Sequence, residues 1–269
     1  MSHLEASYFD FGRLESLSRG NTLLHRLDPR VKVLTTVSYV VAVVSFGPHA
    51  VAALFPFLLY PITLCIWGRL PLAYMLKRVL LVMPFALMVG LFNPFLDREP
   101  LLALGPIVLS GGWVSFISIC MRVFLASIAA FILIGLTGMP NVALGLERLK
   151  VPRLFVVQLL FVYRYIFVLT EEAVRMMRAY TLRSVHGRRP GVRVFSLLVG
   201  HLLLRTLERA RRIYLAMSCR GFTGEVRTVR VFRLRLADVL FLSGWLGLFS
   251  LFRYQNIPAL LGRFAGFAP

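Results

Sequence analysis

The sequence predicts an all-α membrane protein with about five transmembrane helices and two to three long amphipathic helices in the cytoplasm. Of its 269 residues, 58% are hydrophobic, and the mean hydropathy is +0.75, whereas soluble domains contain about 45–50% apolar residues. Five apolar stretches approach the length of about 20 residues that crosses the hydrocarbon core of a bilayer. An arginine-rich region between the fourth and fifth stretches has the periodicity of amphipathic helices.

Four of the apolar stretches precede residue 140. They cover residues 31–47, 50–67, 79–95 and 113–136, and the fifth covers residues 237–252. Gly47 and Pro48 predict a turn between the first two spans. Pro56, Pro61 and Pro84 predict kinks, which membrane helices tolerate where neighbouring groups satisfy the freed carbonyls.

Positive charge is concentrated on one side of these spans. Residues 140–235 contain 19 of the 31 lysines and arginines but only 5 of the 12 acidic residues. Further basic residues flank the spans on the same side: Arg13, Arg19, Arg26, Arg30, Lys32, Arg69, Lys77 and Arg78. The connections on the other side, residues 47–49 and 97–112, contain only Arg98, which lies between Asp97 and Glu99. The positive-inside rule therefore predicts a cytoplasmic N-terminus and basic region, and a C-terminus outside.

The chain is accordingly expected to be a multi-pass protein of the bacterial cytoplasmic membrane with four segments. These are a cytoplasmic N-terminal segment (1–30), a four-helix transmembrane region (31–139), a basic cytoplasmic region (140–236), and a C-terminal transmembrane helix with its tail (237–269). In a soluble protein the net charge of +19 would suggest nucleic-acid binding. Here the basic residues lie between apolar blocks, which favours contact with anionic lipid and no nucleic-acid partner.

Two long helices are expected in the basic region, over residues 151–184 and 194–221. Polar residues share one face of each helix: Glu171, Glu172, Arg175 and Arg178 in the first, and Arg205, Glu208, Arg209 and Arg212 in the second. The apolar face of the second helix contains Leu207, Ala210, Tyr214 and Met217. Residues 154–170 are also apolar enough for a sixth span, and this alternative stays open.

Both helices end on an arginine followed by a small residue, first at Arg183 and Ser184 and then at Arg220 and Gly221. Each pair fits an ordinary helix end, because glycine adopts the left-handed terminal conformation and arginine complements the helix dipole. The repetition of the pattern on two amphipathic helices favours a further role for them. We expect two exposed helix ends that dock into grooves of partner proteins.

The sequence shows no pattern for catalysis or for a cofactor. Its three lysines lie outside any phosphate-binding loop, and its histidines and cysteines lack the spacing of metal ligands. Asp28, Asp97 and Asp238 lie near the ends of spans, where we expect caps or interface residues. Arg122 lies inside the fourth span. For its side chain, contact with Asn93, contact with a partner subunit and extension to the interface are all open, as is the role of His3.

Three stretches resemble a known family. These are GNTLLHRLDPRVKVL at residues 20–34, the helix at residues 151–184, and HLLLRTLERARRIYLAMSCRGFTGE at residues 201–225. They are similar to the transmembrane (T) component of energy-coupling-factor (ECF) transporters, particularly to the cobalt-type CbiQ branch. The likeness runs from about residue 15 to about residue 240.

The resemblance implies a non-catalytic coupling subunit of an ATP-driven importer, most similar to those that import cobalt ions for cobalamin biosynthesis. It implies two cytoplasmic ATPase subunits, which bind ATP and Mg, a separate substrate-capture membrane subunit, and room for a small accessory membrane subunit. It implies no cofactor in this chain. In this family, motifs similar to Ala-Arg-Gly end the two coupling helices. Arg183 and Arg220 match the two arginines and Gly221 matches the second glycine, whereas Leu182, Ser184 and Cys219 depart from the motifs. The resemblance therefore implies coupling to the ATPases through Arg183, Ser184, Arg220 and Gly221.

Other functions stay open. Nickel and a vitamin are the alternative substrates under this resemblance, and a stand-alone carrier, a channel and a membrane enzyme are alternatives from other classes. A carrier should show inverted repeats or ionisable residues at the membrane midplane, and the spans contain only Arg122 as a candidate. An enzyme should show clustered acid, base or metal-binding residues, and the sequence has no such pattern.

Overall fold

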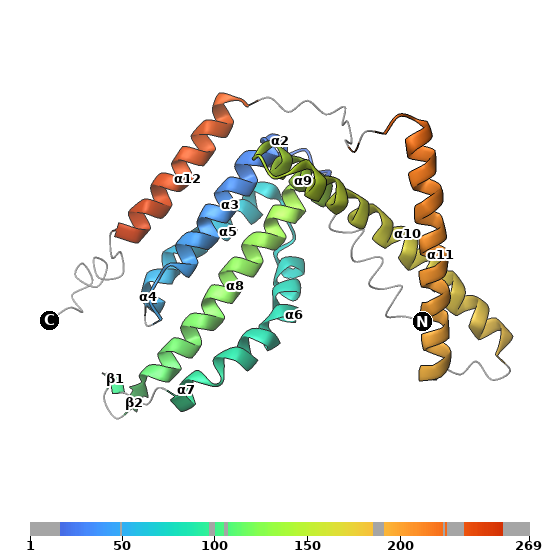
Figure 1. Cartoon of the computed structure of the whole chain (residues 1–269). Helices are drawn as coiled ribbons and strands as arrows, with labels where there is room; N and C mark the ends of the chain where they lie inside the picture. Colours follow the sequence, from blue (N-terminus) through green and yellow to red (C-terminus); the bar gives the residue numbers. More distant parts are fainter. Residues whose placement is uncertain are drawn as a thin grey trace. The chain divides into compact units, whose positions relative to one another are not determined.

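Helices form most of this computed structural model, which describes residues 17–48, 50–96, 100–104, 107–184, 191–222, 224 and 234–254. The prediction of an all-α fold is confirmed, with one short β-hairpin added among the described residues (Figure 1). The chain divides into two compact units. Residues 15–145 and 232–269 form the first, here called the bundle, and residues 1–14 and 146–231 form the second, here called the helix pair.

The bundle contains α2 (Leu23–Arg26), α3 (Pro29–Val44), α4 (Val51–Leu54), the 3₁₀ helix η1 (Phe55–Leu58), α5 (Leu59–Gly68), α6 (Leu72–Gly90), α7 (Asn93–Leu96), α8 (Gly111–Thr137), most of α9 (Met139–Arg148), and α12 (Leu236–Tyr254). The helix pair contains α10 (Arg153–Arg183) and α11 (Val192–Cys219). The four segments predicted from the sequence remain predictions, because a division by contacts does not place a membrane.

Five helical stretches in the described part are long and apolar enough to cross a membrane: Val51–Gly68, Leu72–Gly90, Gly111–Thr137, Arg153–Arg183 and Leu236–Tyr254. Four of them match the second to fifth predicted spans. The first predicted span differs, because its helix α3 has only 16 residues, which rise about 24 Å at 1.5 Å per residue. The remaining stretch is α10, which contains residues 154–170, so the sixth-span alternative stays open.

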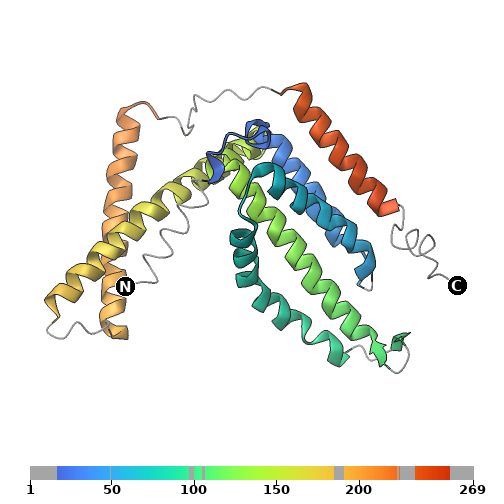
Figure 2. The same cartoon turned by 180° about the vertical axis from the view of Figure 1, so that it is seen from behind.

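Helix α8 is the central element of the bundle and packs against α3, α5 and α6, while α12 packs on α3 (Figures 1 and 2). Two glycines permit the close approach to α8. A Cβ atom at Gly68 would lie 2.6 Å from Leu136 Cδ2, and one at Gly90 would lie 2.8 Å from Phe116 Cδ2. Small residues are common at such contacts because they let membrane helices pack closely.

The prolines predicted to kink the second span divide it into α4, η1 and α5. Pro61 has no N–H, so the Phe57 carbonyl four residues earlier loses its helical partner. The Tyr39 hydroxyl donates to that carbonyl at 3.0 Å, and the Tyr39 ring stacks on Tyr60, with centroids 4.5 Å apart. Phe249 of α12 completes this buried aromatic cluster. A polar group freed by proline is thereby satisfied inside the bundle.

The connection over residues 97–112 contains a hairpin that the sequence did not predict. Strand β1 (Pro100–Leu104) pairs antiparallel with β2 (Ile107–Ser110), and Leu104 lies opposite Ile107. The register shifts between Pro100 and Leu102. Short apolar runs on both sides of a Gly-Pro pair, with the β-branched Ile107 and Val108 in the second run, were the available signal.

Two arginines satisfy backbone carbonyls just beyond the end of α3. Arg122 Nη2 donates to the Gly47 carbonyl and, at 2.9 Å, to Ser118 Oγ. Arg253 Nη2 donates to the Ser45 carbonyl at 3.2 Å. The hydrogen bonds described for Arg122 therefore do not involve Asn93, one of the three contacts considered for it. Cations suit this position because the C-terminal end of a helix carries partial negative charge.

The opposite end of the bundle, where α3, α6 and α12 begin and α5 ends, holds a buried charge cluster. Asp28 caps α3 by accepting from the Arg30 N–H at 2.9 Å, as expected for a span end. Asp238 accepts from the Asp28 N–H at 2.8 Å, so these two span-end aspartates lie close together. Lys32 is buried nearby and donates to the His25 carbonyl at 3.2 Å. The cluster therefore joins the start of α3 to the start of α12. Asp97 and His3 lie outside the described residues.

The segment before α3 is held by His25. In the neutral ring, Nε2–H donates to the Leu17 carbonyl at 3.0 Å, and the Thr22 hydroxyl donates to Nδ1 at 2.6 Å. Burial lowers the pKa of His25 below its ordinary value of 6.5, and the charge of Lys32 lowers it further, against the effect of the Leu17 hydrogen bond. Folding therefore favours the neutral histidine.

We expect the free energy of unfolding to fall as the pH is lowered from about 7.5 to about 5.5, because the unfolded chain then binds a proton that the folded His25 resists. The stabilisation is present above the ordinary histidine pKa and is lost as the pH falls through the lower folded value. Thermal unfolding in detergent across this range measures the effect. His25→Gln should flatten the dependence, and an equal pH dependence in this variant would contradict the assignment.

Candidate functional site

The two helices of the helix pair cross each other (Figure 1), and an ion pair between Glu172 of α10 and Arg205 of α11 joins them. The Glu172 carboxylate accepts from Arg205 of α11 at 2.7 Å and from Arg175 of its own helix at 2.8 Å. The Glu171–Arg175 contact is longer, at 3.8 Å. The polar faces were predicted, but the contact that joins the helices was not. The side chain of Glu172 is 15% exposed, which indicates that it is covered by its partners.

The ion pair between Glu172 and Arg205 should stabilise the crossing modestly. Exposed pairs contribute about 0.2–1 kcal/mol, and the partial burial of Glu172 favours the upper part of that range. A double-mutant cycle of Glu172→Gln and Arg205→Gln, followed by thermal unfolding, measures the coupling. The coupling should weaken with salt, and Arg211→Gln, a change at an exposed neighbouring cation, should show no coupling to Glu172. Equal couplings at Arg205 and Arg211 would contradict the pairing.

Helix α11 ends in a left-handed turn at Gly221, as the sequence predicted. Gly221 has φ +77°, its N–H donates to the Ser218 carbonyl at 3.0 Å, and the Phe222 N–H donates to the Met217 carbonyl at 3.0 Å. This is the Schellman pattern, in which the residue after the helix needs a positive φ. Among the described residues, no atom beyond the chain neighbours of Gly221 lies within 4 Å of a Cβ placed there. Backbone conformation, not crowding within the chain, is thus the reason for glycine here.

Helix α10 ends differently. Ser184 has φ −82° and ψ 126°, an extended conformation, and its N–H donates to the Tyr180 carbonyl at 3.0 Å. Its hydroxyl donates to the Thr181 carbonyl at 3.1 Å. Ser184 thus ends α10 without the left-handed backbone conformation that glycine adopts at the end of α11. The two helix ends share an arginine but not a backbone geometry.

The arginines at these ends are accessible. Arg183 is the last residue of α10, and Arg220 follows the last residue of α11. Both are exposed, and neither has a hydrogen bond or an ion pair to another side chain among the described residues. Their guanidinium groups are therefore available to a partner. Coupling through Arg183, Ser184, Arg220 and Gly221 remains a prediction from sequence.

An apolar groove between α10 and α11, with a volume of about 360 Å³, lies beside their crossing. The predicted apolar face of α11 lines it through Leu207, Ala210, Tyr214 and Met217, and Phe222 after the helix end also contributes. Leu207 is 53% exposed and Tyr214 is 66% exposed, so the groove is open. Arg209, from the predicted polar face, also lines it and is half-exposed.

These features define a multi-pass helical membrane protein with a charged, partly apolar helix pair that ends in two exposed arginines. Comparison with known families gives its membership. Residues 20–229 match the family described as cobalt transport protein, CbiQ. The chain belongs to this family, as the resemblance of the three sequence stretches predicted.

Individual relatives are similar over parts or most of the chain. A cobalt transport protein CbiQ of Rhodobacter capsulatus is 37% identical over 86 residues, which cover 32% of this chain and 35% of that protein. A CbiQ of Salmonella typhimurium is 26% identical over 170 residues, 60% of this chain and 71% of that protein. An energy-coupling factor transporter transmembrane protein EcfT of Bacillus subtilis is 27% identical over 233 residues, which cover 78% of this chain and 84% of that protein.

Proposed function

We propose that this protein is the transmembrane coupling component of an ATP-driven importer of the energy-coupling-factor type. The family membership and the likeness to proteins named EcfT support the class of transporter. The observation that carries the coupling role is the crossed helix pair, whose two ends each present an accessible arginine. Two cytoplasmic ATPase subunits would each receive one of these ends.

The coupling follows from the construction of the helix pair. A long helix transmits movement along its length because its backbone hydrogen bonds keep it stiff. The Glu172–Arg205 contact joins α10 to α11 near their midpoints. Movement of the end of one helix would therefore also move the other helix. The partner ATPases would bind ATP and Mg and perform the hydrolysis, while this chain performs no catalysis and holds no cofactor.

The exposed apolar surface of the helix pair supports contact with a further partner, a membrane protein. Among the described residues of α11 none is buried, and Leu203, Leu204 and Tyr214 are more than half exposed. Apolar surface of this extent marks a protein or lipid contact. We assign it to a substrate-capture membrane subunit, with a small accessory membrane subunit as an additional member in the complex.

The transported substrate proposed here is the cobalt ion, because the matched family and two of the relatives carry that name. Nickel and a vitamin are the alternatives within the same class. The proposed setting is the bacterial cytoplasmic membrane. The basic residues at the starts of α3, α6 and α12 support a cytoplasmic location for that end of the bundle.

Copurification tests this proposal. The tagged full chain is expressed with its candidate ATPases and capture subunit, and the bound subunits are identified by mass spectrometry. We expect two ATPase subunits per complex and ATP-dependent uptake of radioactive cobalt in vesicles. Uptake of nickel or a vitamin instead would show that the assignment of cobalt as the substrate is wrong. Uptake by the chain alone, without ATP, would favour a stand-alone carrier and contradict the coupling role.

A further inference from the structure

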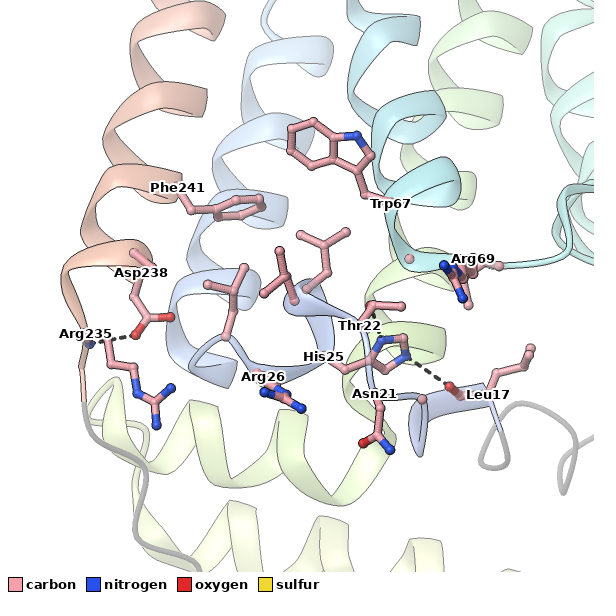
Figure 3. A pocket seen from close by; sticks show the side chains of 17 residues that line it. Leu17, Asn21, Thr22, His25, Arg26, Trp67, Arg69, Arg235, Asp238 and Phe241 are labelled. Atoms are coloured by element: carbon pink, nitrogen blue, oxygen red, sulfur yellow. Dashed lines mark hydrogen bonds between the residues drawn. The ribbon is translucent and has the colours of Figure 1, made fainter.

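A large cavity of the bundle lies where several of its helices begin or end. Its volume is about 1080 Å³, and it is lined by the segment before α3, the end of α5 and the first turns of α12 (Figure 3). Three arginines line it, one from each of these segments: Arg26, Arg69 and Arg235. We call it the arginine pocket. The coupling role of the helix pair makes no use of it.

These three guanidinium groups carry charge that the described structure does not neutralise. All three side chains are exposed, and no acidic group among the described residues lies within ion-pair distance of them. The nearby carboxylate is Asp238, which is 2% exposed and turned inward. Its two oxygens accept from the Asp28 N–H at 2.8 Å and from the Arg235 N–H at 2.7 Å. The arginines therefore form an uncompensated anion-attracting group.

The other walls of the pocket are apolar and aromatic. Leu24, Leu70 and Phe241 line it, and Trp67 contributes an indole ring that is 64% exposed. Figure 3 shows Phe241 and Trp67 on one side of the pocket, with Arg26 and Arg235 on the opposite side. A free inorganic anion gains nothing from such apolar walls. An amphiphile with an anionic head uses both kinds of surface.

The position of the pocket at the ends of the apolar helices indicates that the amphiphile is a membrane lipid. Arg69 follows directly after the apolar stretch Val51–Gly68, and Arg235 precedes the stretch Leu236–Tyr254. Both arginines therefore lie at the ends of candidate spans, at the depth where lipid headgroups lie. Exposed tryptophan and arginine are typical of that interface, and basic pockets between transmembrane helices bind anionic headgroups.

We propose that the arginine pocket binds one anionic phospholipid, with its anionic headgroup among Arg26, Arg69 and Arg235 and its glycerol and upper acyl chains against Trp67 and Phe241. The ligand is a constituent of the leaflet at this end of the bundle. Its binding would hold together the segment before α3, the end of α5 and the start of α12.

Lipid retention by the purified full chain tests the proposal. The protein is delipidated in neutral detergent and titrated with phosphatidylglycerol or phosphatidylcholine, and bound lipid is counted by native mass spectrometry. Wild-type protein should retain phosphatidylglycerol in preference to phosphatidylcholine and should unfold at a higher temperature in its presence. The triple variant Arg26→Gln, Arg69→Asn, Arg235→Gln should bind it roughly a hundredfold more weakly, given the attraction of each arginine to anionic lipid.

The variants are chosen to separate binding from folding. Asparagine tolerates the positive φ of 49° at Arg69, and the Arg235 N–H that binds Asp238 is unchanged. The matched control removes three charges elsewhere, at Arg193, Arg211 and Arg212 of α11, and should bind as wild type does. A triple variant with Lys at the three pocket positions should keep most of the binding because it keeps the charge.

Three outcomes would overturn the proposal. The first is equal retention of phosphatidylglycerol and phosphatidylcholine. The second is equal weakening by the pocket variant and the α11 control, which would indicate a general charge effect. The third is displacement of the lipid by millimolar inorganic phosphate or glycerol 3-phosphate, which would identify a site for soluble anions. None of these readouts requires ATPase subunits or transport, so they are independent of the proposed coupling function.

Discussion

Replacing both Arg183 and Arg220 with alanine should abolish ATP-driven transport while leaving the membrane bundle folded. Both side chains are exposed and have no side-chain partner among the described residues, so their removal leaves no buried group unsatisfied in that part of the chain. In the complex the same groups would meet partner carboxylates, which suit the planar guanidinium fork. Truncating one partner of a desolvated charged contact costs about 2–5 kcal/mol of binding free energy. Losing two such contacts should therefore prevent stable binding of the ATPases.

The measurement combines copurified ATPase, uptake and thermal unfolding of the isolated chain at matched expression. Arg220→Ala alone should weaken ATPase attachment or separate hydrolysis from uptake. The control is the pair Arg211→Ala and Arg212→Ala, which removes two exposed cations from the same helix. Arg209 is unsuitable as a control because it lines the apolar groove. Normal transport by the Arg183 and Arg220 double variant would reduce both motifs to ordinary helix ends.

Comparing the two motifs shows what sequence reasoning can predict. A glycine after a helix predicts a left-handed residue from local backbone preference alone, and Gly221 has that conformation. Ser184 gave no such signal, and its extended backbone follows from the chain around it. The apolar face of α11 was predictable for the same local reason, because a period of 3.6 residues fixes which side chains share a face.

Features that depend on distant residues were not predictable in this way. The Glu172–Arg205 contact spans 33 residues and the Asp28–Asp238 contact spans 210. All three acidic residues were noticed, Glu172 as part of a polar face and Asp28 and Asp238 as residues at span ends. The spacing of residues in one sequence does not indicate which of many arginines or backbone amides will donate a hydrogen bond to a given carboxylate. The arginine pocket was missed for the same reason, since its three arginines come from three separate segments.

Asp238→Ala should be among the most destabilising single substitutions in the bundle. Asp238 is the third residue of α12, and one of its oxygens accepts from the Arg235 N–H just before the helix, as an acidic residue at this position of a capping box does. The other oxygen accepts from the Asp28 N–H. Alanine would leave these donors without an acceptor, each at about 1–3 kcal/mol where buried.

The substitution would also leave the buried Lys32 with one fewer neighbouring carboxylate, so the total loss should be about 2–5 kcal/mol, within the range for breaking a buried polar network. Thermal unfolding in detergent measures it, and loosening of α12 should raise the protease sensitivity of this helix before the rest unfolds. Asp238→Asn keeps one carbonyl acceptor and should lose roughly half as much. Ser243→Ala on the same helix removes only a bond to the Leu240 carbonyl of that helix and should be nearly neutral. If Asp238→Ala unfolded at the same temperature as Ser243→Ala, the contact between Asp28 and Asp238 would not be what holds α12 to the bundle.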